Sequence, residues 1–135
     1  MRQFCTYFDR GYLSRALALY ESLRRHGPPF HLRALCMDLQ SHEALTRLAL
    51  PGFEPVALEE LELAFPDLLR VKPSRTPAEY CWTCTPAVLT HVLDRFKPDH
   101  CTYLDADLFF FSDPGPLLSE MADDELAAVR NREIG

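Results

Sequence analysis

The stretch Phe4-Cys5-Thr6-Tyr7-Phe8 opens the chain with a run of aromatic and apolar residues, which predicts a buried β-strand. The apolar residues that follow recur at the spacing of one helix face: Leu13, Ala16, Leu17, Tyr20 and Leu23. Gly27, followed by Pro28-Pro29, is a typical end of such a helix. A strand that leads directly into an amphipathic helix is the first half of a β-α-β unit, the repeating element of parallel sheets.

The same alternation continues along the chain. Leu32–Met37 predicts a second strand, a short helix is expected from Ser41 to about Leu50, and Phe53–Leu58 predicts a third strand. Residues 59–75 have poor periodicity, so a loop with helical pieces is expected there.

Thr76-Pro77-Ala78-Glu79 is a strong helix start, because threonine can cap, proline suits the first turn and glutamate can complete a capping box. Thr85-Pro86 repeats part of this signal and predicts a kink or a restart. The remaining expected elements are a strand at Cys101–Leu104, an extended segment at Leu108–Phe111, a short helix around Pro116–Met121 and a strand at Leu126–Val129. The pattern predicts one α/β domain over residues 1–135, with a Rossmann-like, mostly parallel sheet, right-handed crossovers and flanking helices.

Composition agrees with a single globular domain, since 47% of the 135 residues are hydrophobic and 25% are charged. The net charge of -6 argues against nucleic acid as a partner, because phosphate binding needs a basic face. No apolar run approaches the ~20 residues needed to cross a bilayer, so no transmembrane segment is expected. Because Asp9-Arg10 interrupts the first apolar segment, no secretory signal is expected either, and a cytoplasmic location follows by default.

The five cysteines form an odd set that does not predict a disulfide framework. Cys81-Trp82-Thr83-Cys84 has C-x-x-C spacing, but zinc would need two further ligands at comparable spacing. We therefore expect Cys81 and Cys84 to be half-buried helix residues.

Tyr103-Leu104-Asp105-Ala106-Asp107 is the segment that points to chemistry. It places two carboxylates at the carboxyl end of a predicted strand, where open α/β sheets bind their ligands. Two such carboxylates repel one another unless a cation or a proton lies between them, and their oxygens suit Mg²⁺ or Mn²⁺. The alternative is a solvated strand end whose aspartates make turn hydrogen bonds. The position between two apolar runs favours a metal that bridges the chain to a diphosphate.

The segment from Tyr103 to Pro114 resembles the D-x-D block of nucleotide-diphospho-sugar transferases with the GT-A fold, and is similar to glycosyltransferase family 8 and its bacterial relatives. Residues 4–26 resemble the first strand, nucleotide loop and first helix of these enzymes, and Glu79–Pro86 resembles the helix before their D-x-D strand. The resemblance spans nearly the whole chain. Family members are considerably longer, so it implies the N-terminal, nucleotide-binding part of a truncated GT-A fold.

The resemblance also implies roles for particular residues. Asp107 would hold the metal, Mn²⁺ or Mg²⁺, and Asp105 would share it or contact the donor ribose. The other residues implied in donor binding are Thr6, Tyr7 and Asp9 for the base and ribose, Lys72 and Arg75 for the diphosphate, and Ala106, which leaves room beside the backbone. Two alternatives stay open: Asp9 capping the first helix, and Lys72 and Arg75 lying in an ordinary solvated loop.

The implied activity is transfer of a hexosyl-type group from a nucleotide-diphospho-sugar, with a UDP-sugar as the expected donor, to an unknown acceptor. Family 8 implies retention at the anomeric carbon, but no residue here is identified as a catalytic nucleophile. None of the five histidines is assigned as a ligand, and His91 is expected to be a partly buried core residue. The alternative function is a non-catalytic nucleotide-sugar-binding or oligomerising remnant, in which exposed apolar surface would favour a homo-oligomer.

Overall fold

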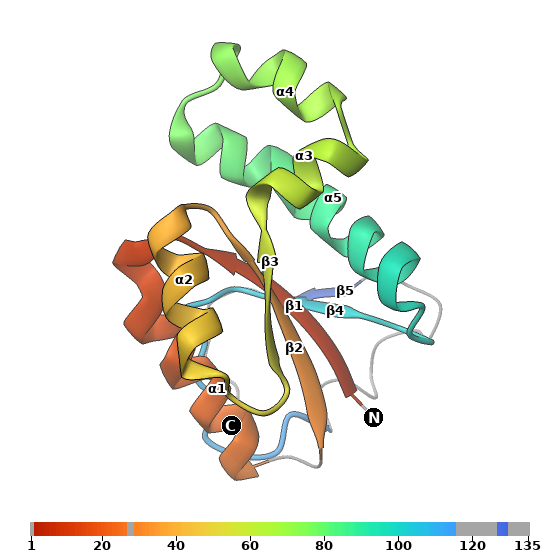
Figure 1. Ribbon diagram of the computed structural model, residues 1–135. Coiled ribbons are helices and arrows are strands. Elements are labelled where there is room, and N and C mark those ends of the chain that lie inside the picture. The colour runs from red at the N-terminus through yellow and green to blue at the C-terminus, as the bar shows by residue number, and fades with distance from the viewer. Residues whose placement is uncertain (1, 27–28, 116–126, 130–135) are drawn as a thin grey trace.

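The computed structural model describes residues 2–26, 29–115 and 127–129 (Figure 1). Its helices and strands are, in chain order, β1 (Arg2–Phe8), the 3₁₀ turn η1 (Arg10–Tyr12), α1 (Leu13–His26), β2 (Phe30–Cys36), α2 (Leu39–Leu48), β3 (Phe53–Ala57), α3 (Leu58–Ala64), α4 (Asp67–Val71), the 3₁₀ turn η2 (Lys72–Ser74), α5 (Pro77–Phe96), β4 (Thr102–Leu104) and β5 (Ala127–Val129). Nearly every predicted element is present. The short helix expected around residues 116–121 lies outside the described residues.

The described strands form one sheet in the order β3-β2-β1-β4-β5, and each neighbouring pair is parallel. The strand β1 lies in the middle, where Cys5 is opposite Arg33 of β2 on one side and Tyr103 of β4 on the other. Parallel neighbours of this kind need crossover connections, which the helices supply. The prediction of an α/β, Rossmann-like fold with a parallel sheet is confirmed.

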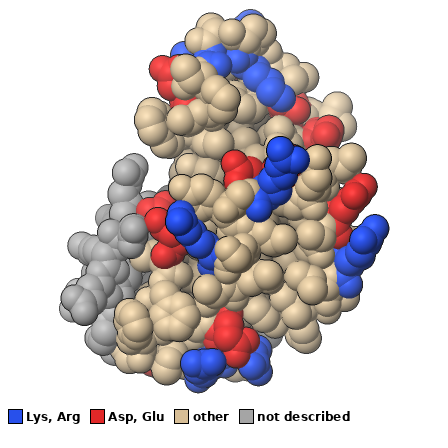
Figure 2. All heavy atoms as spheres, turned by 90° about the vertical axis from the view of Figure 1, so that its left-hand side faces the viewer, with Lys and Arg blue, Asp and Glu red and all other residues tan. Residues whose placement is uncertain are grey.

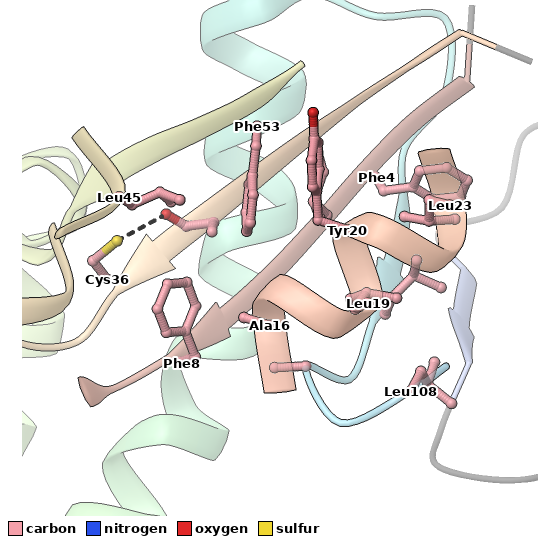
Figure 3. Close-up of a cluster of buried hydrophobic side chains, with 14 of the residues drawn as sticks. Phe4, Phe8, Ala16, Leu19, Tyr20, Leu23, Cys36, Leu45, Phe53 and Leu108 are labelled. Carbon is pink, nitrogen blue, oxygen red and sulfur yellow. Dashed lines mark hydrogen bonds between the residues drawn. The ribbon is translucent and has the colours of Figure 1, made fainter. Parts of the chain in front are cut away.

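Helices cover both faces of this sheet (Figure 1). Phe4 and Phe8 of β1 pack with α1 and α2, and Figure 3 shows this cluster around Leu19 and Tyr20. Cys5 and Tyr103 pack on the opposite face, with buried residues of α3, α4 and α5. Because strand side chains alternate between faces, β1 supplies both cores and is covered on each side.

The helix α5 is continuous through Pro86, so the restart considered in the sequence analysis does not occur, and a kink at Pro86 stays a prediction. The capping box is confirmed: Thr76 Oγ1 accepts from the Glu79 backbone N–H, and Glu79 Oε1 accepts from the Thr76 backbone N–H. A proline costs the helix one hydrogen bond. Burial of Tyr80, Cys84, Val88 and Val92 along one helix face offsets that cost.

Residues 59–75 form the helical pieces α3, α4 and η2, which pack beside α5. Glu60 of α3 binds two residues of α5: its Oε2 lies 2.6 Å from His91 Nε2 and also accepts from Arg95. His91 is buried, as expected. Burial alone would raise the pKa of Glu60, but the hydrogen bond from His91 and the charge of Arg95 outweigh it, so this pKa lies below its ordinary value.

We therefore expect a pH-dependent contribution of Glu60 to stability. A carboxyl group whose pKa is lowered by folding stabilises the protein above its unfolded-state pKa, and this contribution is lost as the pH falls through the lower, folded-state pKa. Urea unfolding at pH 7 and near pH 4 should show a smaller loss of stability on acidification for Glu60→Gln than for the unchanged protein. The control is Glu59→Gln, which alters the exposed neighbour. Equal pH slopes for both variants would contradict the expectation.

Among the described residues, none of the helices is long and apolar enough to span a membrane. Figure 2 shows one face of the molecule, on which basic and acidic side chains are interspersed. Ion pairs among the described residues include Arg24 with Glu21, Arg33 with Glu54, and Arg70 with Asp67.

Candidate functional site

Successive strands are added to the sheet first on one side of β1 and then on the other, so the strand order changes direction between β1 and β4. After β1 it leads through α1 to β2 on one side, whereas β4 and β5 lie on the other side. The loops that follow two such strands run in opposite directions and leave a crevice outside the carboxyl ends of the strands. Open α/β sheets bind ligands at this topological switch point. Asp9 directly follows β1, and Asp105 directly follows β4.

Short hydrogen bonds hold the loop after β1. The Oδ1 atom of Asp9 accepts from the Gly11 backbone N–H at 2.9 Å, so Asp9 caps the turn η1. The Oδ2 atom of Asp38 accepts from the Arg10 backbone N–H at 3.0 Å, while its Oδ1 caps α2 through the Ser41 N–H at 2.9 Å. Asp9 therefore caps η1, the turn that leads into α1, and it remains at the crevice.

The loop after β4 is a tight turn. The Leu108 backbone N–H donates to the Asp105 carbonyl at 3.1 Å, which places Ala106 and Asp107 at the tip of the turn. Leu108 and Phe110 are buried under α1, and Ser22 Oγ accepts from the Phe110 backbone N–H at 3.1 Å. The buried residues Leu108 and Phe110 thus anchor the turn, while Asp107 is exposed and Asp105 is half-buried.

These two loops and the first part of α5 enclose a pocket of about 330 Å³. Its lining is Tyr7, Phe8, Asp9 and Tyr12 from β1 and η1, Met37 after β2, Ala78, Cys81 and Trp82 from α5, and Tyr103, Asp105, Ala106 and Asp107 from β4 and its turn. The volume lies in the range of small-molecule sites. Five of the lining side chains are aromatic and three are carboxylates, and no lysine, arginine or histidine of the described chain is among them.

A pair of tyrosines contributes to the lining. The rings of Tyr7 and Tyr103, on neighbouring strands, stack with centroids 5.8 Å apart. Burial raises the pKa of Tyr7 despite hydrogen bonds from Tyr103 and Thr85. Burial also raises the pKa of Tyr103, and the neighbouring Tyr7 and then the charge of Asp105 raise it further. Both phenols stay neutral at physiological pH and offer the pocket a hydroxyl donor rather than a charge.

The structure brings most of the predicted site residues together. Tyr7, Asp9, Asp105, Ala106 and Asp107 all line the pocket. They come from two segments almost 100 positions apart in the sequence, so their meeting is a consequence of the parallel pairing of β1 with β4.

Three predicted residues lie elsewhere. Thr6 is fully buried within β1, and its Oγ1 has no hydrogen-bond partner among the described residues. Lys72 Nζ donates to Glu62 Oε2 at 2.8 Å and lies over the ring of Tyr80. Arg75 is exposed and does not line the pocket. A contact of Thr6, Lys72 or Arg75 with a donor stays a prediction.

The wall formed by α5 was not predicted from the sequence. Ala78, Cys81 and Trp82 fall on the helix face turned away from the buried residues Tyr80 and Cys84. The available signal was Trp82 itself, because a tryptophan outside the apolar face of an amphipathic helix does not serve the core. Tyr12, which follows Asp9 in the first loop, gave a similar but weaker signal.

The carboxylates can be compared with the needs of a divalent metal. In the part of the chain that the structure describes, no three His, Cys, Asp or Glu side chains gather into a group that could hold a metal ion. Mg²⁺ is commonly bound by one or two carboxylates together with substrate phosphates and water. Asp105 and Asp107 fit that mode of binding, in which the ligand completes the coordination, and do not fit a closed structural site.

Cys81 gives the pocket a chemical reporter. It is half-buried, whereas the other four cysteines are buried. Burial raises the pKa of the Cys81 thiol, and the negative charge of Asp9 raises it further. We expect a thiol reagent to modify Cys81 before the other cysteines of the native protein. The substitution Asp9→Asn should make the reaction of Cys81 several-fold faster. Asparagine retains an oxygen that can cap η1.

Peptide mapping after limited reaction with 5,5′-dithiobis(2-nitrobenzoate) measures this rate, and Cys81→Ser should remove the fast phase. Preferential labelling of another cysteine, or an unchanged rate in Asp9→Asn, would contradict the pocket geometry.

Comparison with known proteins gives two relatives, both in Bacillus subtilis strain 168. The chain is 37% identical to the uncharacterized protein YfnD over 118 residues, which cover 87% of this chain and 37% of that protein. It is also 37% identical to the uncharacterized protein YfnF over 123 residues, which cover 89% of this chain and 39% of that protein. The chain thus spans less than two fifths of the length of these relatives. No protein-family model matches the chain.

Proposed function

We propose that this chain binds a nucleotide-diphospho-sugar together with Mn²⁺ or Mg²⁺, as the donor site of a glycosyltransferase. The observation that carries the proposal is the pocket at the switch point between β1 and β4, which combines three carboxylates with five aromatic side chains. Carboxylates suit a hard divalent cation, and aromatic faces suit a nucleobase. The resemblance of residues 103–114 to the D-x-D block supports the same assignment.

Electrostatics make the cation essential to this proposal. A diphosphate that enters this pocket meets three carboxylates, of Asp9, Asp105 and Asp107, and no basic side chain among the described lining residues. Lys72 is held by Glu62, and Arg75 lies outside the pocket. Without a bridging cation, the carboxylates and the diphosphate repel each other because both are negatively charged. Binding of the donor is therefore expected to depend on the metal.

Five of the lining residues have a definite part in the proposed site. Asp107 and Asp105 would hold the cation, and Ala106 between them leaves space beside the backbone. Tyr7 and Asp9 offer a hydroxyl donor and a carboxylate acceptor to the ribose and base. When bound, the cation would stabilise the charge that develops on the nucleoside diphosphate as the glycosyl bond breaks. Transfer to an acceptor, whose identity is unknown, a cytoplasmic location and a homo-oligomer stay predictions.

Two other functions compete with this proposal. A non-catalytic nucleotide-sugar-binding or oligomerising unit would use the same pocket without transfer. The lining of carboxylates and aromatic rings also suits an organic cation, because aromatic faces attract quaternary ammonium groups. Binding of an organic cation needs no metal, and this difference separates it from the proposed binding of a nucleotide-diphospho-sugar.

Isothermal titration calorimetry tests the proposal. The protein is titrated with UDP, with a panel of UDP-sugars and with choline, each with and without Mn²⁺. We expect UDP and at least one UDP-sugar to bind in the presence of Mn²⁺ and to bind at least about tenfold more weakly without it. Release of UDP from a bound donor would indicate turnover, and binding without release favours the non-catalytic unit. Binding of choline alone, or of no nucleotide, would contradict the proposal.

A further inference from the structure

Trp82 occupies an unusual position in this pocket. It is the only tryptophan of the chain, it lies on α5, and it is 65% exposed while it lines the pocket. Burial of a large aromatic side chain on folding lowers the free energy of the folded state. Because Trp82 is mostly exposed, its ring contributes little of this stabilisation. Its indole ring is therefore available to a ligand.

The backbone around Trp82 is held firmly. Tyr80, two positions before it, is buried and donates its hydroxyl to Glu62 Oε2 at 2.6 Å. Cys84, two positions after it, is fully buried. Since positions two apart on a helix point in nearly opposite directions, this anchoring turns Trp82 away from the core. The capping box at Thr76 and Glu79 fixes the start of the same helix.

We infer that Trp82 is a stacking platform for an uncharged ring of the ligand in this pocket. Because this inference rests on the proposed function, the ring is either the nucleobase or the transferred glycosyl ring of the donor. Asp105 and Asp107 line the same pocket from the turn after β4 and would hold the charged diphosphate through the cation. An indole face adds affinity for an uncharged ring and none for the diphosphate itself.

Position distinguishes Trp82 from most other exposed apolar side chains of the described residues, of which Tyr12, at 45% exposure, also lines the pocket. Phe111 is equally exposed, at 65%, but it lies against Phe109 and outside the pocket. Leu63 and Leu69 are exposed on α3 and α4, also outside the pocket. Phe111→Ala is therefore a matched control, since it removes an aromatic ring of the same exposure that the ligand does not reach.

Tryptophan fluorescence tests the inference directly, because the single tryptophan reports on this pocket alone. With Mn²⁺ present, titration with UDP or a UDP-sugar should quench the emission of Trp82, whereas pyrophosphate should leave it nearly unchanged. In calorimetry, Trp82→Ala should weaken nucleotide binding about 10- to 100-fold and leave the affinity for pyrophosphate within about twofold. Trp82→Phe should retain most of the affinity, and Phe111→Ala should retain all of it.

The arms of this experiment separate the possible results. Weakened binding of UDP identifies the base as the stacked ring, and weakened binding of the UDP-sugar alone identifies the glycosyl ring. If Mn²⁺-dependent nucleotide binding is intact in Trp82→Ala, the stacking inference is wrong and the proposed function stands. If no nucleotide binds to the unchanged protein, both are wrong. An equal loss of pyrophosphate binding would show that Trp82 acts on the fold of the site.

Discussion

Replacement of Asp107 by alanine is expected to weaken Mn²⁺-dependent binding of a UDP-sugar by more than about 100-fold, because loss of even an indirect partner of a metal site costs 10- to 100-fold. Asp107 lies at the tip of the turn after β4 and is exposed. The turn is anchored by Leu108 and Phe110, so the substitution should leave the fold intact. The affinity is measured by calorimetry, and circular dichroism checks the fold.

Two further variants make this result specific. Asp107→Asn keeps the size of the side chain and removes its charge, and we expect almost the same loss. Asp94→Asn removes an exposed carboxylate from α5, outside the pocket, and should bind the donor like the unchanged protein. If Asp107→Asn retained metal-dependent binding, or if Asp94→Asn lost it, the role of Asp107 as a metal ligand would be refuted.

Leu19→Ala is expected to lower the free energy of unfolding by about 2–5 kcal/mol, the usual cost of such a cavity in a core. Leu19 is fully buried on α1 and belongs to the same cluster as Phe4 and Leu23 (Figure 3). Domains of this size are stable by only about 5–15 kcal/mol, so the change removes a large share of the stability. Urea denaturation followed by circular dichroism measures the loss.

Leu63→Ala provides the matched control, since the chemical change is identical and Leu63 is 79% exposed on α3. Its effect should stay within about 0.5 kcal/mol. Similar losses for the two variants would mean that α1 does not pack on the sheet as described.

Much of the fold was predictable because local signals agree with tertiary packing. The spacing of Leu13, Ala16, Leu17, Tyr20 and Leu23 predicted α1, and three of these five side chains are buried. The start of α5 was predictable from Thr76 and Glu79 because the capping box is a local interaction. The strand β1 begins at Arg2, earlier than predicted, since its pairing with Phe30 of β2 is set by a distant segment.

Part of the candidate site could be predicted from the sequence for a similar reason. Asp9 and Asp105 each follow an apolar strand, and parallel strands place their carboxyl ends at one edge. The surroundings of Lys72 were not predictable, because its partners Glu62 and Tyr80 meet it only after α3, η2 and α5 have packed. The same holds for Cys81 and Trp82, whose place in the pocket depends on how α5 lies across the sheet. The continuity of α5 through Pro86 likewise follows from packing and not from local propensity.

The most direct measurement is a crystal structure of the protein with Mn²⁺ and UDP, analysed for anomalous scattering. The proposed site predicts one strong manganese peak between the carboxylates of Asp105 and Asp107, about 2.0–2.3 Å from their oxygens, with the diphosphate bound to the same ion. Carboxylates that point apart with no peak between them, or manganese bound elsewhere while UDP occupies the pocket, would contradict it.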